Sequence, residues 1–335
     1  GFLRAHPCCL GRVVVPLPPT MRTRVSTVAR SKNPRRARAS RFVTGAARWW
    51  NALLIPLMGW WSHGLLSGAV AAETPQPYIA RSWLAEDGLP HNYVLAVAQT
   101  RDGYLWVGTR GGLARFDGMQ FTPFAPAGLE GMGVSCLCEG ADGSLWVGLE
   151  TNGVVRLKGQ SFWHYSLTNA SGRNYTRVLC AGRDGAVWIG TRGGLVQYAD
   201  GLFRDIPLAA GLVVPVVETL CEDPAGRIWA GTTVGLCCVS NGVVTATFTA
   251  RNGLPADLVA SVFADGHDSL WVGTSAGLVR FRDGMFHTVY TEANGLADRF
   301  IQVLHEDRKG HLWIGTYGGL YRTVNEPPPG TEPGP

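Results

Sequence analysis

The side chains best suited to bind a ligand lie in loops that follow a repeated motif. The motif is an apolar residue, Trp, a small or apolar residue, Gly and usually Thr; in three copies a charged residue comes next, Arg110, Glu150 and Arg192. Guanidinium groups bind oxyanions through paired N–H donors, whereas carboxylates accept hydrogen bonds from hydroxyl and ammonium groups. Loops with this mixture indicate recognition of a small polar ligand.

A second set of polar residues lies in the loops that lead into each repeat. If the two sets of loops meet on one face, they supply guanidinium, amide and phenol groups that would suit an oligosaccharide or another polar, anionic small molecule. For each residue the alternative is a solvated turn residue. The candidate ligand-binding residues are His91, Asn92, Arg110, Glu150, Asn174, Tyr175, Arg192, Asp257, Asp298, Arg299 and Tyr317.

The sequence gives no catalytic or metal-binding motif in its usual context. It has no H-E-x-x-H and no G-x-x-x-x-G-K-[ST], and its histidines are scattered. Its one G-x-S-x-G, residues 273–277, coincides with a copy of the repeated Gly-Thr segment, in a region without helical periodicity. No C-x-x-C occurs either, so a zinc site has no ligand pattern to rest on. We therefore expect no enzymatic activity, no cofactor and no bound metal.

Three cysteines occupy equivalent places in successive repeats. Cys138, Cys180 and Cys221 each stand eight residues before the repeated Trp. A disulfide needs Cα atoms within about 7 Å, which equivalent positions of neighbouring repeats do not provide. We expect these thiols to be reduced and buried.

The repeat itself must position the loops. Trp106, Trp146, Trp188, Trp229, Trp271 and Trp313 are separated by 40, 42, 41, 42 and 42 residues. A period near 42 means that each repeat is one supersecondary unit. The fold must therefore be read from that unit.

Each repeat has the pattern of four short strands. In the first, 94–98, 105–109, 113–116 and 121–124 are apolar or alternating, and Asp-Gly turns precede the second and fourth of these strands. Such units predict an all-β fold, a β-propeller of four-stranded antiparallel blades with six repeats, either six-bladed or a truncated seven-bladed propeller. A Trp that recurs in every blade predicts packing between blades rather than a sugar platform.

The two ends of the repeat array suggest how it closes. The last repeat stops after its third strand, at 319–323, and Ile79 and Trp83 precede Gly88 at the spacing that Phe286 and Tyr290 have before Gly295. We expect the N-terminal segment to supply the missing outer strand of the last blade, which would leave no open edge.

Charge divides the chain into parts. Residues 1–72 hold 11 basic and no acidic residues, and an apolar run ending in Ala69-Val70-Ala71 follows the basic stretch. This order predicts a basic leader with a signal peptide and extracytoplasmic, periplasmic location; a retained membrane anchor is the alternative. The propeller, 77–325, is acidic overall, which argues against nucleic-acid binding, and the Pro/Gly tail, 326–335, is predicted to be disordered.

The repeats resemble a known family. Trp83 to Pro90, Arg101 to Thr109 and Gly112 to Gly118 are similar to the opening of two-component regulator propellers. The resemblance implies an extracytoplasmic ligand-binding sensor domain whose relatives continue into a histidine kinase or diguanylate cyclase module. No such output module follows in this sequence.

Three functions follow from this interpretation. The first is a periplasmic sensor propeller that binds a small polar ligand and acts as a monomer or a homodimer. The second is a stand-alone scaffold for protein interaction, which a large apolar patch would favour. The third is an enzyme similar to the streptogramin lyases, which a central His with a metal or acidic partner would favour.

Overall fold

A computed structural model describes residues 81–125, 130–167, 174–208, 215–265, 268–307 and 309–323. The predicted signal peptide, residues 1–72, and the tail, 326–335, lie outside these ranges. From Ser82 onward the described residues belong to one compact unit. None of its helices is long and apolar enough to cross a membrane.

Twenty-three strands and three short 3-10 helices make up the described residues. The first three blades contain η1 (Ala85–Asp87), β1 (Val94–Gln99), β2 (Leu105–Thr109), β3 (Gly112–Phe116), β4 (Phe121–Phe124), β5 (Val134–Glu139), β6 (Leu145–Leu149), β7 (Val154–Lys158), β8 (Ser161–Tyr165), β9 (Thr176–Ala181), β10 (Val187–Thr191), β11 (Gly194–Ala199) and β12 (Leu202–Ile206). The last three contain β13 (Val217–Glu222), β14 (Ile228–Thr232), β15 (Gly235–Ser240), β16 (Val243–Phe248), η2 (Ala250–Asn252), β17 (Val259–Ala264), β18 (Leu270–Thr274), β19 (Gly277–Arg282), β20 (Met285–Tyr290), η3 (Glu292–Asn294), β21 (Ile301–Glu306), β22 (Leu312–Thr316) and β23 (Gly319–Arg322).

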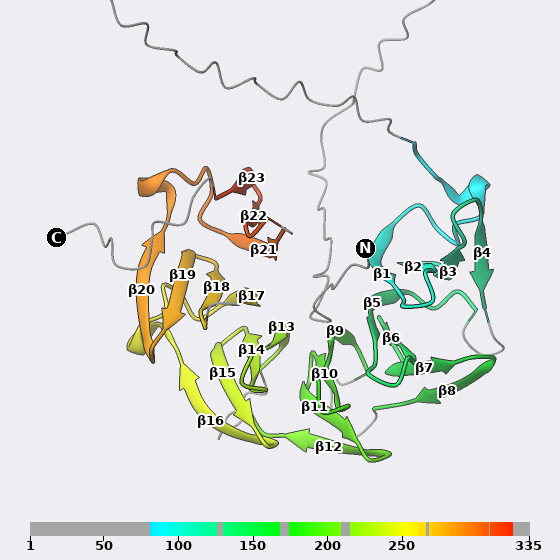
Figure 1. Cartoon of the computed structure of the whole chain (residues 1–335), viewed down its shortest axis with the longest axis horizontal. Helices are drawn as coiled ribbons and strands as arrows, with labels where there is room; N and C mark the ends of the chain where they lie inside the picture. The colour runs from blue at the N-terminus through cyan, green and yellow to red at the C-terminus, as the bar shows by residue number, and fades with distance from the viewer. Residues whose placement is uncertain are drawn as a thin grey trace, which may run out of the picture. The chain divides into compact units, whose positions relative to one another are not determined.

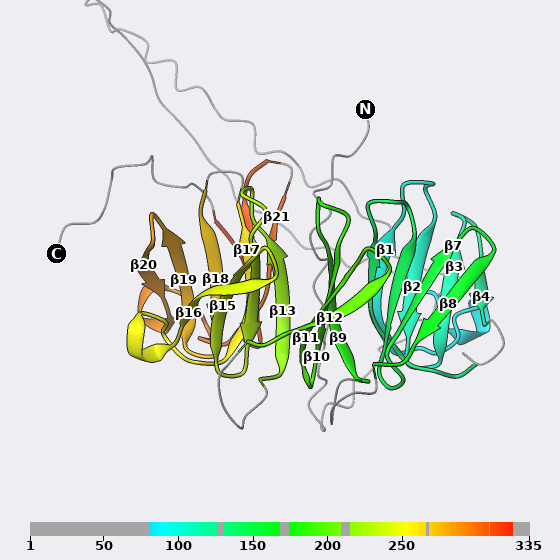
Figure 2. The same ribbon diagram turned by 90° about the horizontal axis from the view of Figure 1, so that it is seen from below.

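The strands form six separate antiparallel sheets in chain order. Five sheets have four strands and the sixth, β21-β22-β23, has three. In every sheet sequence neighbours pair, so each is a simple meander, and the first strand of each blade lies on the inside of the arc while the fourth lies outside (Figure 1). From the side, the blades stand next to one another with their connecting loops at the two ends of the strands (Figure 2). The predicted propeller of four-stranded blades is confirmed.

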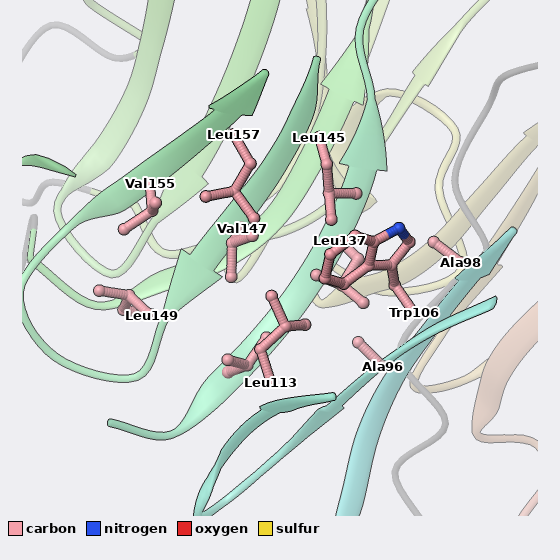
Figure 3. Packing of buried hydrophobic residues seen from close by; sticks show 11 residues of the cluster. Ala96, Ala98, Trp106, Leu113, Leu137, Leu145, Val147, Leu149, Val155 and Leu157 are labelled. Carbon is pink, nitrogen blue, oxygen red and sulfur yellow. The ribbon is translucent and has the colours of Figure 1, made fainter. Parts of the chain in front are cut away.

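The repeated Trp belongs to the core between blades, as predicted. Trp106 of blade one packs with Leu137 and Leu145 of blade two (Figure 3). Trp146, Trp188, Trp229 and Trp271 each join a cluster with the following blade in the same way. Five clusters therefore hold five pairs of neighbouring blades together. Most of the free energy of unfolding must come from this buried apolar area.

The cysteines are also as predicted. Cys138, Cys180 and Cys221 are buried and free, as are the other cysteines of the described residues, Cys136, Cys237 and Cys238. Burial raises the pKa of the Cys237 and Cys238 thiols, which disfavours the reactive thiolate. These residues act as small apolar side chains.

A β-bulge recurs at the start of the first strand in all six blades. In blade one, Val94 pairs with Thr109 and Ala96 with Gly108, so Leu95 is the extra residue. The extra residues of the other blades are Ser135, Arg177, Glu218, Ala260 and Gln302. A bulge re-aims the side chain it carries. Here it does so at the loop end of each inner strand.

The ends of the array lack the packing of its middle. Leu320 in β23 is 65% exposed, whereas its equivalents Leu236 and Leu278 are at most 1% exposed. Val94 in β1 is half-buried, whereas its equivalents Val217 and Val259 are fully buried. Each inner strand from β1 to β17 contacts that of the next blade, and no comparable packing joins β21 to β1 within the described residues (Figure 1).

The expected closing strand is only partly described. Residues 82–84 lie outside any strand, and β23 pairs with β22 alone in the described residues, so a pairing of Trp83 with the last blade is not observed. Trp83 packs instead on blade one, 5.5 Å from Phe116 and 6.1 Å from Phe121 between ring centroids. Phe248 of β16 packs on Phe281 and Phe286 of the next blade in the same manner. Trp83 thus occupies the position of the last residue of an outer strand that precedes blade one.

Candidate ligand-binding face

A threonine organises the turn that carries the candidate charges. The Thr191 hydroxyl donates to the Gly194 carbonyl at 2.9 Å and accepts from the Gly193 amide at 3.0 Å. Thr109, Thr232, Thr274 and Thr316 make the same pair of bonds. The hydroxyl closes the turn between the second and third strands, so the residue after Thr is held at the end of the blade.

A backbone bond joins the two sets of loops. The amide of Arg110 donates to the Tyr93 carbonyl at 3.1 Å, and that of Arg192 donates to the Tyr175 carbonyl at 3.2 Å. Blades two, four and five repeat this bond through Glu150, Thr233 and Ser275. The two sets of loops therefore lie on one face, as the sequence predicted.

On this face two guanidinium groups lie over tyrosine rings. Arg110 is 4.2 Å from the centroid of the Tyr93 ring, and Arg192 is 4.0 Å from that of Tyr175. Both arginines are exposed, and neither forms an ion pair with another described residue. Stacking on a ring restricts the guanidinium but leaves its N–H donors for an oxyanion.

Blade two has a carboxylate where blades one and three have arginine. The Glu150 side chain is half-buried and lies over Gly133, where a Cβ would collide with its carboxylate. The Tyr175 hydroxyl donates to Glu150 Oε1 at 3.5 Å. Glycine therefore provides the room for this carboxylate, and Tyr175 contacts both it and the Arg192 guanidinium.

Just inside the face, two bulge residues form an ion pair between blades. Arg177 of β9 and Glu218 of β13 are joined by a charge-assisted hydrogen bond, and both side chains are largely buried. Their mutual neutralisation keeps the net charge of the inner wall near zero at this point. The unpaired charges of the face are those in the loops above.

Five other candidates hold their own loops together. His91 Nδ1 accepts from the Tyr93 amide at 2.8 Å, and the side-chain oxygens of Asn92, Asn174, Asp257 and Asp298 accept from backbone amides at 2.6 to 2.8 Å. Asn92 and Asp257 occupy equivalent places in their repeats, and they accept from the amides of Ala85 and Ala250. Arg299 is exposed in the loop before blade six.

The position after the second strand is uncharged in the other three blades. Thr233 and Ser275 replace the charged residues of blades one to three, and in blade six the rings of Tyr317 and Phe300 lie 5.3 Å apart. Tyr317 is 58% exposed. The structure thus brings Arg110, Glu150, Tyr175, Arg192 and Tyr317 to the loop tips.

Sequence reasoning missed several residues of this arrangement. Tyr93 and Phe300 are equivalent to Tyr175, and aligning the repeats on the Trp would have found both. Arg177 and Glu218 carried no signal, because a bulge is not visible in an alternating strand pattern. Among the described ranges, no group of three or more His, Cys, Asp and Glu residues could hold a metal ion.

Four segments match the family model described as two component regulator propeller. They are residues 88–111, 128–151, 211–233 and 295–318, which belong to blades one, two, four and six. A comparison with curated proteins gives no match. The resemblance of the repeats to this family is therefore confirmed in these four segments.

Solved structures share the fold at low identity. The extracellular domain named for the hybrid two component system BT3049 of B. thetaiotaomicron has a TM-score of 0.60 and 21% identity over 71% of this chain, which covers 35% of that domain. A catalytically inactive virginiamycin B lyase of Staphylococcus aureus, solved with Quinupristin, has a TM-score of 0.59 and 16% identity over 70% of this chain and 82% of its own. At these identities the likeness concerns the propeller alone.

Proposed function

We propose that this chain, which is built from two-component regulator propeller repeats, is an extracytoplasmic sensor that binds a small polar ligand on the face carrying Arg110, Glu150 and Arg192. The observation that supports it is the presence of solvent-accessible charges without ionic partners, held on tyrosines at equivalent loop tips. Surface charges that serve only solubility do not need to be held in position by an aromatic ring or a hydrogen bond.

Signal output would come from outside this sequence. The chain covers about a third of the BT3049 extracellular domain, 35% of its length, and the family implies a histidine kinase or diguanylate cyclase partner. A ligand changes such a partner only if it binds two states of the propeller with different affinity. The flexible element would be a blade interface or a homodimer contact.

The test is a thermal-shift screen of the purified protein against oligosaccharides, amino acids and anionic metabolites. A ligand that binds only the folded state raises the melting temperature by mass action. We expect a hit whose shift is lost in Arg110→Ala or Arg192→Ala.

Arg115→Ala is the matched control for that screen. Arg115 also lies 4.2 Å from a tyrosine ring, that of Tyr104, but Tyr104 follows the turn at the opposite end of blade one. Equal loss of binding in Arg115→Ala and Arg192→Ala would place the ligand elsewhere. No hit from the whole library would overturn the small-ligand sensor.

A second candidate function, a protein-interaction scaffold, is favoured by exposed apolar residues at the other end of the blades. The tips of the turns between third and fourth strands carry Met119, Leu202, Val243 and Met285, which are 59 to 83% exposed. Replacing all four with Ser should leave ligand binding unchanged. Loss of a homodimer or of partner capture in that variant would support a scaffold instead.

We further propose that the protein is exported by its N-terminal segment and that it is not an enzyme. Fusion of residues 1–80 to a reporter enzyme that is active only outside the cytoplasm should give activity, and a silent fusion would contradict export. For lyase chemistry the sequence offers His91 on this face, whose Nδ1 accepts from the Tyr93 amide. Turnover of a streptogramin that is lost in His91→Ala would overturn the non-enzymatic assignment.

A further inference from the structure

The charges that directly follow the second strand alternate in sign along three successive blades. Arg110, Glu150 and Arg192 occupy the same position, directly after the second strand of blades one, two and three. Within the described residues none of the three has an oppositely charged partner. The face therefore presents the order positive, negative, positive.

Tyr175 contacts both the negative charge of Glu150 and the positive charge of Arg192. Its ring lies under the Arg192 guanidinium at 4.0 Å, while its hydroxyl contacts Glu150 at 3.5 Å. The phenol thus separates the two charges, and a backbone bond from Arg192 to the Tyr175 carbonyl fixes the pair. Arg110 is fixed to Tyr93 by the same two contacts.

We propose that this row binds a zwitterion in which two acid groups flank an amine, as in an acidic amino acid or a short peptide that contains one. This inference rests on the proposed function and narrows its ligand. Each carboxylate of the ligand would form an ion pair with one guanidinium, of Arg110 or Arg192, and the ammonium group would form an ion pair with Glu150. An anion without the amine would meet repulsion from Glu150, and a neutral sugar would leave all three charges without a partner.

Other charges of the face lie outside this row. Arg177 and Glu218, at the start of the inner strands, neutralise one another, and Arg299 lies in the loop before blade six. Asp257 and Asp298 accept hydrogen bonds within their own loops. Selectivity for the amine therefore depends on Glu150.

The experiment compares ligands that differ at the amine, which is free and charged in one member of each pair and acetylated and neutral in the other. Isothermal titration of the purified full chain at pH 7 uses L-glutamate with N-acetyl-L-glutamate, and glutamyl-glutamate with its N-acetyl form; maltotriose is the neutral probe. We expect the free amine to bind about tenfold or more tightly than its acetylated form, because hydrogen bonds between charged groups are the strong ones.

Variants assign that difference to the row. Glu150→Gln should remove the discrimination between amine and acetylated amine, while Arg192→Ala should weaken binding of both forms. Tyr175→Phe keeps the ring between the charges and should bind almost normally, whereas Tyr175→Ala lets Arg192 and Glu150 approach and should lose affinity for the acids. A difference in ligand affinity between Tyr175→Phe and Tyr175→Ala distinguishes this spacing role from a general loss of stability.

Several outcomes would overturn the inference. They are equal affinity for free and acetylated amines in the native protein, discrimination that survives in Glu150→Gln, and absence of binding by all four acids. Maltotriose binding that depends on Arg192 would also overturn it, but would leave the proposed sensor function standing.

Discussion

At the scale of single residues, the threonine of the repeat links stability to the candidate site. Thr191 is fully buried, and both of its side-chain bonds lie within the turn that carries Arg192. Thr191→Val keeps the shape and leaves the Gly194 carbonyl and the Gly193 amide without this partner, so we expect a cost of about 1–3 kcal/mol in the free energy of unfolding. Chemical denaturation measures it.

Thr191→Ser is the control, because it keeps the hydroxyl and loses one methyl group, worth about 0.8 kcal/mol. Ligand affinity should fall in the Val variant and stay near normal in the Ser variant. Equal free energies of unfolding for Thr191→Val and the native protein would show that the turn does not depend on the hydroxyl.

Gly133 gives a second prediction at this scale. A methyl group there would collide with the Glu150 carboxylate, which belongs to a flexible side chain and can move away. Gly133→Ala should therefore change the melting temperature little but reduce the preference for the free amine. A thermal scan and titrations with glutamate and its acetylated form test this, and unchanged selectivity would contradict the position assigned to Glu150.

At the scale of elements, the turns opposite the candidate ligand-binding face depend on ionised aspartates. Burial would raise the pKa of Asp142, but hydrogen bonds from Ser144, Arg156 and Lys158 outweigh it and hold that pKa well below its usual range. A carboxyl whose pKa is lowered on folding stabilises the protein above its unfolded pKa, about 4. That stability is lost as the pH falls from about 4 towards the folded pKa.

Asp142→Asn should therefore lower the melting temperature at pH 7, and the difference from the native protein should shrink below pH 4. Melting curves between pH 7 and pH 2.5 measure it. Asp283→Asn, a change at an exposed turn, is the control and should show little difference at any pH. A constant difference for Asp142→Asn across the range would contradict the ionic role.

The strands were predictable because the same pattern of apolar strands and Asp-Gly turns, weak in any one repeat, recurs in all six. The strands of the first repeat, expected at 94–98, 105–109, 113–116 and 121–124, agree with the structure to within one residue. The candidate site was harder to predict. The sequence places Arg192 in a loop, but it does not show that the guanidinium lies on the Tyr175 ring. Asn92 and Asp257 show the same limit, since the backbone amides that they accept from lie seven residues earlier.

At the scale of the whole molecule, the open ends can be tested with glycines. A Cβ at Gly273 would lie 2.6 Å from Ile301 of the next blade as well as against its own blade. At the equivalent Gly315 it would meet Val303 of its own blade alone within 3.4 Å. Gly273→Ala should therefore destabilise by about 1–3 kcal/mol, the usual cost of overpacking, and Gly315→Ala by distinctly less.

Denaturation of the two variants in parallel decides the matter. Equal costs would mean that the inner strand of another blade covers this face of blade six in solution, as closure of the propeller requires. The packing of Trp83 on blade one supplies one half of that arrangement. The closing strand itself includes residues outside the described ranges.

The recurring bulge has a consequence for how such propellers diversify. Its extra residue is Leu, Ser, Arg, Glu, Ala or Gln in the six blades, yet the ladder around it keeps one register. Duplication of a repeat therefore copies a position at which one backbone geometry holds six different side chains. A substitution there can change the contacts of one blade while the scaffold keeps its register.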